Sequence, residues 1–248
     1  TESEGDFRNI TISNIVFDRS RGLALESVDG SHIEDVAISN LTMRDVSNAP
    51  LFLRLGARLR APEGTPIGSI RRVSISNVVV SDADPRYASI LAGLPGHPIE
   101  DVHLSHITIH YRGGLTLDDA AKQPAALVNT FFFRGQGGIP PREPYAVPER
   151  EKEYPEPSMF DLLPASGFFL RHAAGIQMDH ITLSYAKEDT RPVFVLDDVD
   201  GLEFDHVQAR TAPAALNLRV KDVRNLVIRD SSIAPDGRID QTEPKEFK

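Results

Sequence analysis

Arginines recur at positions from which they could bind an anionic ligand. Three of them lie within seven residues in the stretch "RLGARLR": Arg54, Arg58 and Arg60. Arg171 and Arg219 stand in two further short apolar segments, "GFFLRH" and "AALNLRV". A guanidinium binds a carboxylate through two parallel hydrogen bonds, so arginines on one surface suit a ligand that carries carboxylates. We therefore predict that these five arginines bind substrate.

Three carboxylates are candidates for acid–base chemistry. Glu26 ends the segment "GLALE", and Asp197 and Asp198 form a pair in "RPVFVLDD". Glycoside hydrolysis needs one carboxylic acid and one carboxylate, so Glu26 with Asp197 or Asp198 is a candidate pair. His97, in the turn "LPGHP", is expected at the rim of the same surface and is assigned to substrate binding. The alternative is an ordinary solvated sheet face with a structural histidine.

The elements that would position these residues come from a repeat. Four stretches are nearly the same: "FRNITISNIVF", "IEDVAISNLTM", "IRRVSISNVVV" and "IEDVHLSHITI". Apolar and polar residues alternate within each, which is the spacing of a β-strand. A second, shorter apolar strand follows each copy. A short unit that repeats in this way buries its apolar face by stacking on its neighbours. The sequence predicts an all-β, right-handed parallel β-helix of about seven coils.

A polar residue interrupts each copy at an equivalent position. These positions are Asn14, Asn40, Asn77, His106, His180, His206 and Asp230. Asn tolerates the left-handed backbone conformation of a sharp turn, and His and Asp follow it in tolerance. We therefore interpret the three histidines as turn residues rather than metal ligands, and we predict neither a metal site nor a cofactor.

Alternation also orients the second set of strands. If Leu23 and Leu25 face the core, Glu26 faces outward, and the same rule turns Arg54 and Arg171 outward. Charged and small residues stacked on an outer sheet face suit a shallow groove for a polymer. The orientation rule thus predicts a ligand face on this set of strands.

The chain is expected to form one β-helix domain over residues 1–233, followed by a polar tail at 234–248. Its longest insertion, at 112–166, is too long for an ordinary turn of a tight solenoid. We expect this insertion to pack over the β-helix and to act as a lid. The aromatic residues for this packing are Phe131, Phe132, Phe133, Tyr145 and Tyr154. Three glutamates nearby are interpreted as solvated: Glu149, Glu151 and Glu153.

Composition limits the partners. The chain has 248 residues, is 40% hydrophobic and carries a net charge of −9. A nucleic-acid-binding protein needs a basic face, so this balance argues against that class. No apolar stretch is long enough to span a bilayer. We expect no nucleic acid or membrane partner. The absence of Cys fits a secreted or periplasmic protein.

The stretch from "FRNITISNIVF" to "RLGARLR" resembles glycoside hydrolase family 28, the polygalacturonase-like enzymes that degrade pectin. The resemblance continues through "YASILAGLPGHPIEDVHLSHI", "VPEREKEYPEP" and "SGFFLRH". It implies a right-handed parallel β-helix and inverting hydrolysis of uronate- or rhamnose-containing polymers. The family's Asn-Thr-Asp, Asp-Asp, Gly-His-Gly and Arg-Ile-Lys motifs are absent from their expected context. The resemblance therefore covers only the C-terminal half of such an enzyme, and no catalytic residue is carried over.

Three functions are compatible with the sequence. The chain could be part of a hydrolase acting on acidic polysaccharides such as polygalacturonate or rhamnogalacturonan. It could instead be a non-catalytic β-helix that binds polysaccharide or protein, or a short hydrolase with a new carboxylate pair. We also expect a homo-oligomer formed through the exposed N-terminal coil, because an uncovered solenoid end leaves strand edges unpaired.

Overall fold

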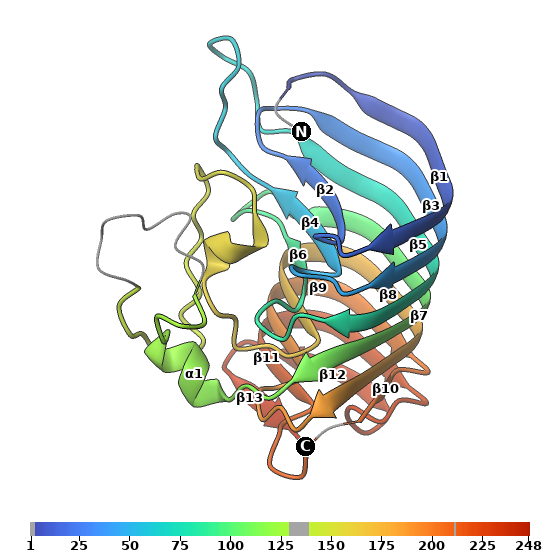
Figure 1. The fold of residues 1–248 in the computed structure, drawn as a ribbon. Coiled ribbons are helices and arrows are strands. Elements are labelled where there is room, and N and C mark those ends of the chain that lie inside the picture. The colour runs from blue at the N-terminus through green and yellow to red at the C-terminus, as the bar shows by residue number, and fades with distance from the viewer. Residues whose placement is uncertain (1–2, 129–138, 211) are drawn as a thin grey trace.

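The computed structural model describes residues 3–128, 139–210 and 212–248 of the chain, and its regular secondary structure is almost entirely β-strand (Figure 1). The longer strands are β1 (Phe7–Asp18), β3 (His32–Arg44), β5 (Ser69–Ala83), β7 (Ile99–Gly113), β8 (Phe168–Lys187), β9 (Phe194–Asp205) and β11 (Leu218–Arg229). The shorter ones are β2 (Leu23–Ser27), β4 (Leu51–Leu55), β6 (Ser89–Ala92), β10 (Gln208–Ala209), β12 (Gly237–Gln241) and β13 (Lys245–Phe247). The expected all-β class is confirmed.

All these strands belong to one large sheet, and most of its pairs are parallel. One run is β1-β3-β5-β7-β8, and a second is β2-β4-β6-β8. Strand β8 joins the two runs, because Phe168–Arg171 pairs with β6 while the stretch from Ala173 onward pairs with β7. The sheet therefore turns at His172. It is open, with β1 at one end of the strand order and β2 at the other.

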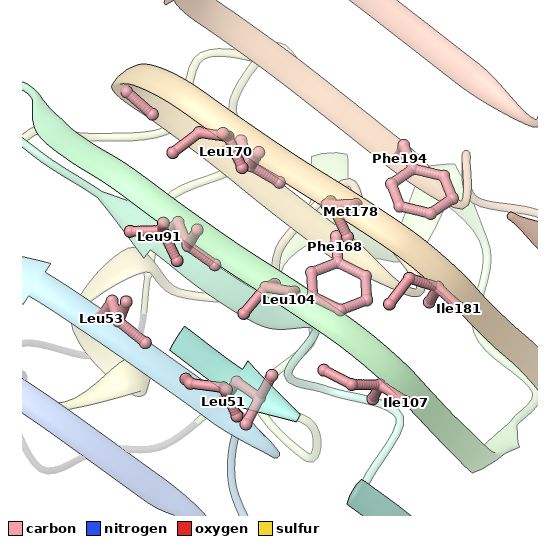
Figure 2. Close-up of a cluster of buried hydrophobic side chains, with 14 of the residues drawn as sticks. Leu51, Leu53, Leu91, Leu104, Ile107, Phe168, Leu170, Met178, Ile181 and Phe194 are labelled. Carbon is pink, nitrogen blue, oxygen red and sulfur yellow. The ribbon is translucent and has the colours of Figure 1, made fainter. Parts of the chain in front are cut away.

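The core lies between the two runs of strands (Figure 2). Leu53 of β4 and Leu91 of β6 belong to the same buried cluster as Leu104 of β7, and Phe168 of β8 stacks on Phe194 of β9. Each of these side chains is fully buried. Burial of one such side chain stabilises the fold by about 1.5–3 kcal/mol relative to leaving it exposed.

The predicted turn column is confirmed. All seven of its residues have a positive φ, for example 58° at Asn40 and 51° at His180. The asparagine side chains form a ladder: Asn40 Nδ2 donates to Asn14 Oδ1 at 3.0 Å, and Asn77 Nδ2 donates to Asn40 Oδ1 at 3.2 Å. The turn therefore stacks from one strand to the next.

A second column of left-handed residues lies five positions earlier in every copy. It consists of Asn9, Asp35, Arg72, Asp101, Gly175, Gly201 and Asn225. Each copy of the repeat thus bends at two equivalent positions. The constant spacing of five residues between the two columns is a further signal of the repeat in the sequence.

The insertion lies against the outer face of the second run of strands (Figure 1). It contains the short helix α1 (Leu117–Lys122) and the single turn η1 (Pro157–Phe160). Val147, Met159 and Phe160 of the insertion pack on Phe52 of β4 and Phe169 of β8. Of the aromatic residues expected to make this contact, Phe131, Phe132 and Phe133 lie outside the described residues. We call residues 145–157 the strap.

Residues 234–248, expected as a polar tail, are mostly exposed, and their strands β12 and β13 pair antiparallel with β11. No helix in the described part of the chain is long and apolar enough to cross a membrane.

Candidate functional site

The predicted ladder of charged residues exists as a row across the second run of strands. The parallel register places in one line Glu26, Arg54, Ala92, Arg171, Asp197 and Lys221. We call this line the cross-strand row. Arg219 was expected in it but lies two residues away in the register, beside Val195, and Lys221 takes the place instead.

Arg54 is outward-facing as expected but is not available to a ligand, because the strap covers it. The side chain is fully buried. Its Nη1 donates to the carbonyl of Gly93 at 2.9 Å, and Nη2 donates to the carbonyl of Glu149 at 2.8 Å. Burial lowers the pKa of Arg54 to about 10, with the Glu149 carboxylate acting against it. The residue still carries its charge at neutral pH, and this charge holds the strap.

Arg171 has the same structural role. Its Nη2 donates to the carbonyl of Val147 at 2.7 Å, and its Nη1 donates to Glu149 Oε1 at 2.8 Å. The side chain is 3% exposed. Asp197 lies on its other side, with 3.5 Å between Arg171 Nε and Asp197 Oδ2. The assignment of Arg54 and Arg171 to substrate binding therefore does not fit the structure.

The remaining predicted arginines fall in different environments. Arg58 donates from Nε to Asp29 Oδ1 at 3.0 Å, and its side chain is 5% exposed. Arg219 is buried with its guanidinium 3.6 Å from the ring centre of Tyr145. Arg60 is exposed and bonds to Asp29 only through its backbone N–H. Of the five arginines, Arg60 alone presents its side chain to solvent.

Glu26 and the aspartates at 197 and 198 do not form an acid–base pair. Glu26 is on β2 and Asp197 is on β9, four strand steps away across the row. With strands about 4.8 Å apart, this separation is roughly 19 Å. It is far beyond the roughly 5–10 Å that glycoside hydrolysis requires.

A different charged group is assembled where the sheet turns. His172 Nδ1 lies 2.7 Å from Asp198 Oδ2, and His172 Nε2 lies 3.3 Å from both oxygens of Glu149. Ionised carboxylates only accept hydrogen bonds, so both ring nitrogens must donate, as they do in the imidazolium form. Glu149 was interpreted as solvated, but its carboxylate is 36% exposed and fixed between His172 and Arg171.

The electrostatics of this group are those of an ion cluster. Burial alone lowers the pKa of His172, but hydrogen bonds to Glu149 and Asp198 outweigh it, and the pKa is raised. Burial alone raises the pKa of Glu149, but His172 and Arg171 outweigh it, and the pKa is lowered. Both shifts favour the charged forms, the imidazolium of His172 and the carboxylate of Glu149.

A polar pocket of about 370 Å³ opens beside His172, and we call it the corner pocket. Asp198, Asp200 and Arg224 supply its charged wall, and Leu94 and Pro98 supply an apolar edge. His97 is exposed in the turn between these last two residues, next to the pocket rather than in its lining. The pocket has the size of a small-molecule site and offers both hydrogen-bond donors and acceptors.

Sequence reasoning found Asp198 and the neighbourhood of His97 but missed His172, Glu149, Asp200 and Arg224. The available signal was the position of His172, directly after the outward Arg171 and in register with Asp198 at the same bend. Glu149 has no repeat register, so nothing in the sequence placed it here.

Comparisons with known proteins add little. No family model matches the chain, and no curated protein matches it. Among solved structures, a candidate glycosyl hydrolase from Parabacteroides merdae aligns over 79% of this chain and 72% of its own. The two share 12% identity with a TM-score of 0.28, which supports no conclusion about fold or activity. The resemblance to family 28 therefore stays a prediction.

Proposed function

We propose that this protein is a carbohydrate-active, right-handed parallel β-helix that binds a saccharide in the corner pocket. Support for the β-helix comes from the parallel pairing of strands that recur along the chain. Asn14 pairs with Asn40 at a separation of 26 residues, and Asn40 with Asn77 at 37. Stacked repeats of this kind present long polar faces, which suit polymeric ligands.

The observation that carries the proposal is the composition of the corner pocket. A sugar needs several acceptors and donors for its hydroxyls, together with an apolar surface for its ring carbons. Asp198 and Asp200 are acceptors, and the Arg224 side chain is a donor that is 59% exposed. Leu94 and Pro98 supply the apolar surface. The pocket thus contains the groups that saccharide recognition requires.

We further propose that the ligand is a pectin-like acidic polysaccharide, such as polygalacturonate or rhamnogalacturonan. This step rests on the family resemblance and on cations near the pocket. Arg224 in the pocket and Lys221 on the same strand are both substantially exposed. Each is already paired with an aspartate, Arg224 with Asp200 and Lys221 with Asp197, so a uronate must compete for it. Neutral glycans therefore belong in the same test.

Hydrolysis is a second candidate function of the same site. This candidate rests on the family resemblance and on the carboxylates beside the pocket. The His172 ring stands between the carboxyl groups of Glu149 and Asp198 and fills the space in which an inverting glycosidase holds its water. These two carboxylates therefore do not form an inverting pair as they stand, and hydrolysis would require His172 to move aside.

Native electrophoresis in gels that contain one polysaccharide each tests the proposal. The panel should hold polygalacturonate, rhamnogalacturonan and a neutral glucan, and reducing ends should be followed in parallel. Retarded migration in at least one gel supports saccharide binding, and new reducing ends would add hydrolysis. Unretarded migration in every gel, with no new reducing ends, would overturn the proposal.

A further inference from the structure

The three histidines of the turn column form a regular stack on the surface. The rings of His106 and His180 lie 4.8 Å apart between centres, and those of His180 and His206 lie 4.7 Å apart. Their planes differ by 2° and 1°. The spacing is that of neighbouring strands, so the sheet itself sets it. We call these residues the histidine column.

Two of the three rings are oriented by a carboxylate. His180 Nδ1 lies 2.7 Å from Asp179 Oδ1, and His206 Nδ1 lies 2.7 Å from Asp205 Oδ1. A carboxylate accepts, so Nδ1 carries the hydrogen and the lone pair of the neutral ring lies on Nε2. A carboxylate behind the ring is the arrangement that orients metal-ligating histidines in proteins.

The side chains are accessible and can move. His180 and His206 are each 51% exposed. A transition-metal ion binds imidazole nitrogen at about 2.0–2.1 Å, along the lone pair in the plane of the ring. The lone pairs of two parallel rings point side by side, so the rings must turn substantially toward each other to share one ion. Exposed rings on separate strands can make that adjustment. Ligand atoms of His106, Asp179 and His180 already lie within 4.8 Å of one another, as do those of Asp205, His206 and Asp230.

We infer that the histidine column binds a divalent transition-metal ion, such as Zn²⁺ or Ni²⁺, through Nε2 of adjacent histidines. His180 stacks on both His106 and His206, and its single Nε2 lone pair can bind only one ion. The histidine column therefore binds one ion per chain. Imidazole selects zinc, nickel and copper, whereas Mg²⁺ and Ca²⁺ prefer oxygen ligands. The site does not depend on the proposed saccharide pocket, which lies at the bend formed by His172 and Asp198.

Titration calorimetry of the full chain with Zn²⁺ and with Ni²⁺ tests this inference. The variant is His180→Asn, because Asn holds the same left-handed position at Asn14, Asn40 and Asn77 and should preserve the turn. We expect one ion per wild-type chain and an affinity at least about tenfold lower in His180→Asn. The matched control is His97→Asn, which removes an exposed histidine elsewhere and should leave the affinity unchanged. Ca²⁺ should produce no binding heat.

A second variant tests the role of the carboxylate as a positioning group. Asp179→Asn cannot hold His180 as strongly, and a lost partner of this kind lowers metal affinity by about 10–100-fold. Circular dichroism of each variant shows that the fold is retained. The inference is overturned if wild-type protein binds neither ion, if His180→Asn binds as tightly as wild type, or if Ca²⁺ binds as well as Zn²⁺.

Discussion

At the scale of single residues, the burial of an arginine side chain decides whether it can bind a ligand or instead holds a segment of the chain in place. Arg54 and Arg171 point away from the core, as alternation requires, yet both are covered by the strap and bonded to its carbonyls. Leaving a buried carbonyl without its hydrogen-bond donor costs about 1–3 kcal/mol. These two arginines therefore stabilise the position of Glu149 beside the corner pocket.

Arg171→Ala should lower the free energy of unfolding by about 2 kcal/mol, because it leaves the Val147 carbonyl without its donor and removes one of the two cationic partners of Glu149. Urea unfolding followed by circular dichroism measures the change. Arg229→Ala is the control, since Arg229 makes only an exposed ion pair with Glu203, and it should move the midpoint little. Equal midpoints for Arg171→Ala and wild type would contradict the structural role.

The raised pKa of His172 predicts a pH-dependent stability. A histidine whose pKa is higher in the folded than in the unfolded chain stabilises the fold below its unfolded value, near 6.5, and loses this effect as pH rises through the folded value. The difference in unfolding free energy between wild type and His172→Asn should be largest at about pH 6 and shrink toward alkaline pH. Asn tolerates the positive φ of 48° at this position. Urea titrations from pH 6 to 9 measure it, and a constant or growing difference would be inconsistent with the ion cluster.

The sequence was sufficient to orient residues on strands but not to say what lies over them. Period-two alternation correctly turned Arg54 outward, because side-chain direction on a strand is a local property. Its burial depends on residues 145–157, which are irregular and have no repeat to fix their register. For the same reason Glu149 could not be assigned to His172.

At the scale of elements, the bends of the long strands depend on residues that tolerate left-handed backbone. Asn40→Ala should destabilise the fold by about 2 kcal/mol, because it adds backbone strain and removes the side-chain bonds to Asn14 and Asn77. Asn40→Gly loses the same bonds without the strain, so it should be less destabilised. Thermal melts of the two variants separate backbone strain from the lost hydrogen bonds. A lower melting temperature for Asn40→Gly than for Asn40→Ala would show that backbone strain does not dominate at this bend.

The turn column was predictable because Asn, His and Asp recur at one register in a periodic pattern. The bend at His172 was not, since it lies between two short apolar segments that read as separate strands, "GFFL" and "GIQMDHITL". The structure runs them together as β8, which joins both runs of the sheet.

At the scale of the whole molecule, the end formed by β1 and β2 differs from the end formed by β11. Strands β12 and β13 cover β11, whereas in the described part of the chain β1 pairs with β3 alone and β2 with β4 alone. A pocket lined mainly by apolar residues opens between them, with Ile10, Ile12 and Leu25 in its wall.

Association through this end is therefore expected, because unpaired strand edges and exposed apolar surface favour self-pairing. Light scattering should show a mass above that of one chain, and Ile12→Lys should shift the population toward monomer. Thr108→Lys, an exposed position on β7 in the middle of the sheet, is the control and should leave the mass unchanged. A wild-type protein that stays monomeric at high concentration would rule this association out.

The measurement that tests the central claim most directly is calorimetric titration of the protein with oligosaccharides from the polymer that retards it. Asp200→Asn changes an acceptor in the wall of the corner pocket, and Asp222→Asn changes a comparable aspartate one strand step beyond Asp198, outside the pocket lining. The account predicts that the first variant loses at least about tenfold in affinity, as expected when a hydrogen bond from a ligand to a charged acceptor is lost, and that the second binds like wild type. Equal affinity in wild type and Asp200→Asn would contradict the account and place saccharide binding elsewhere.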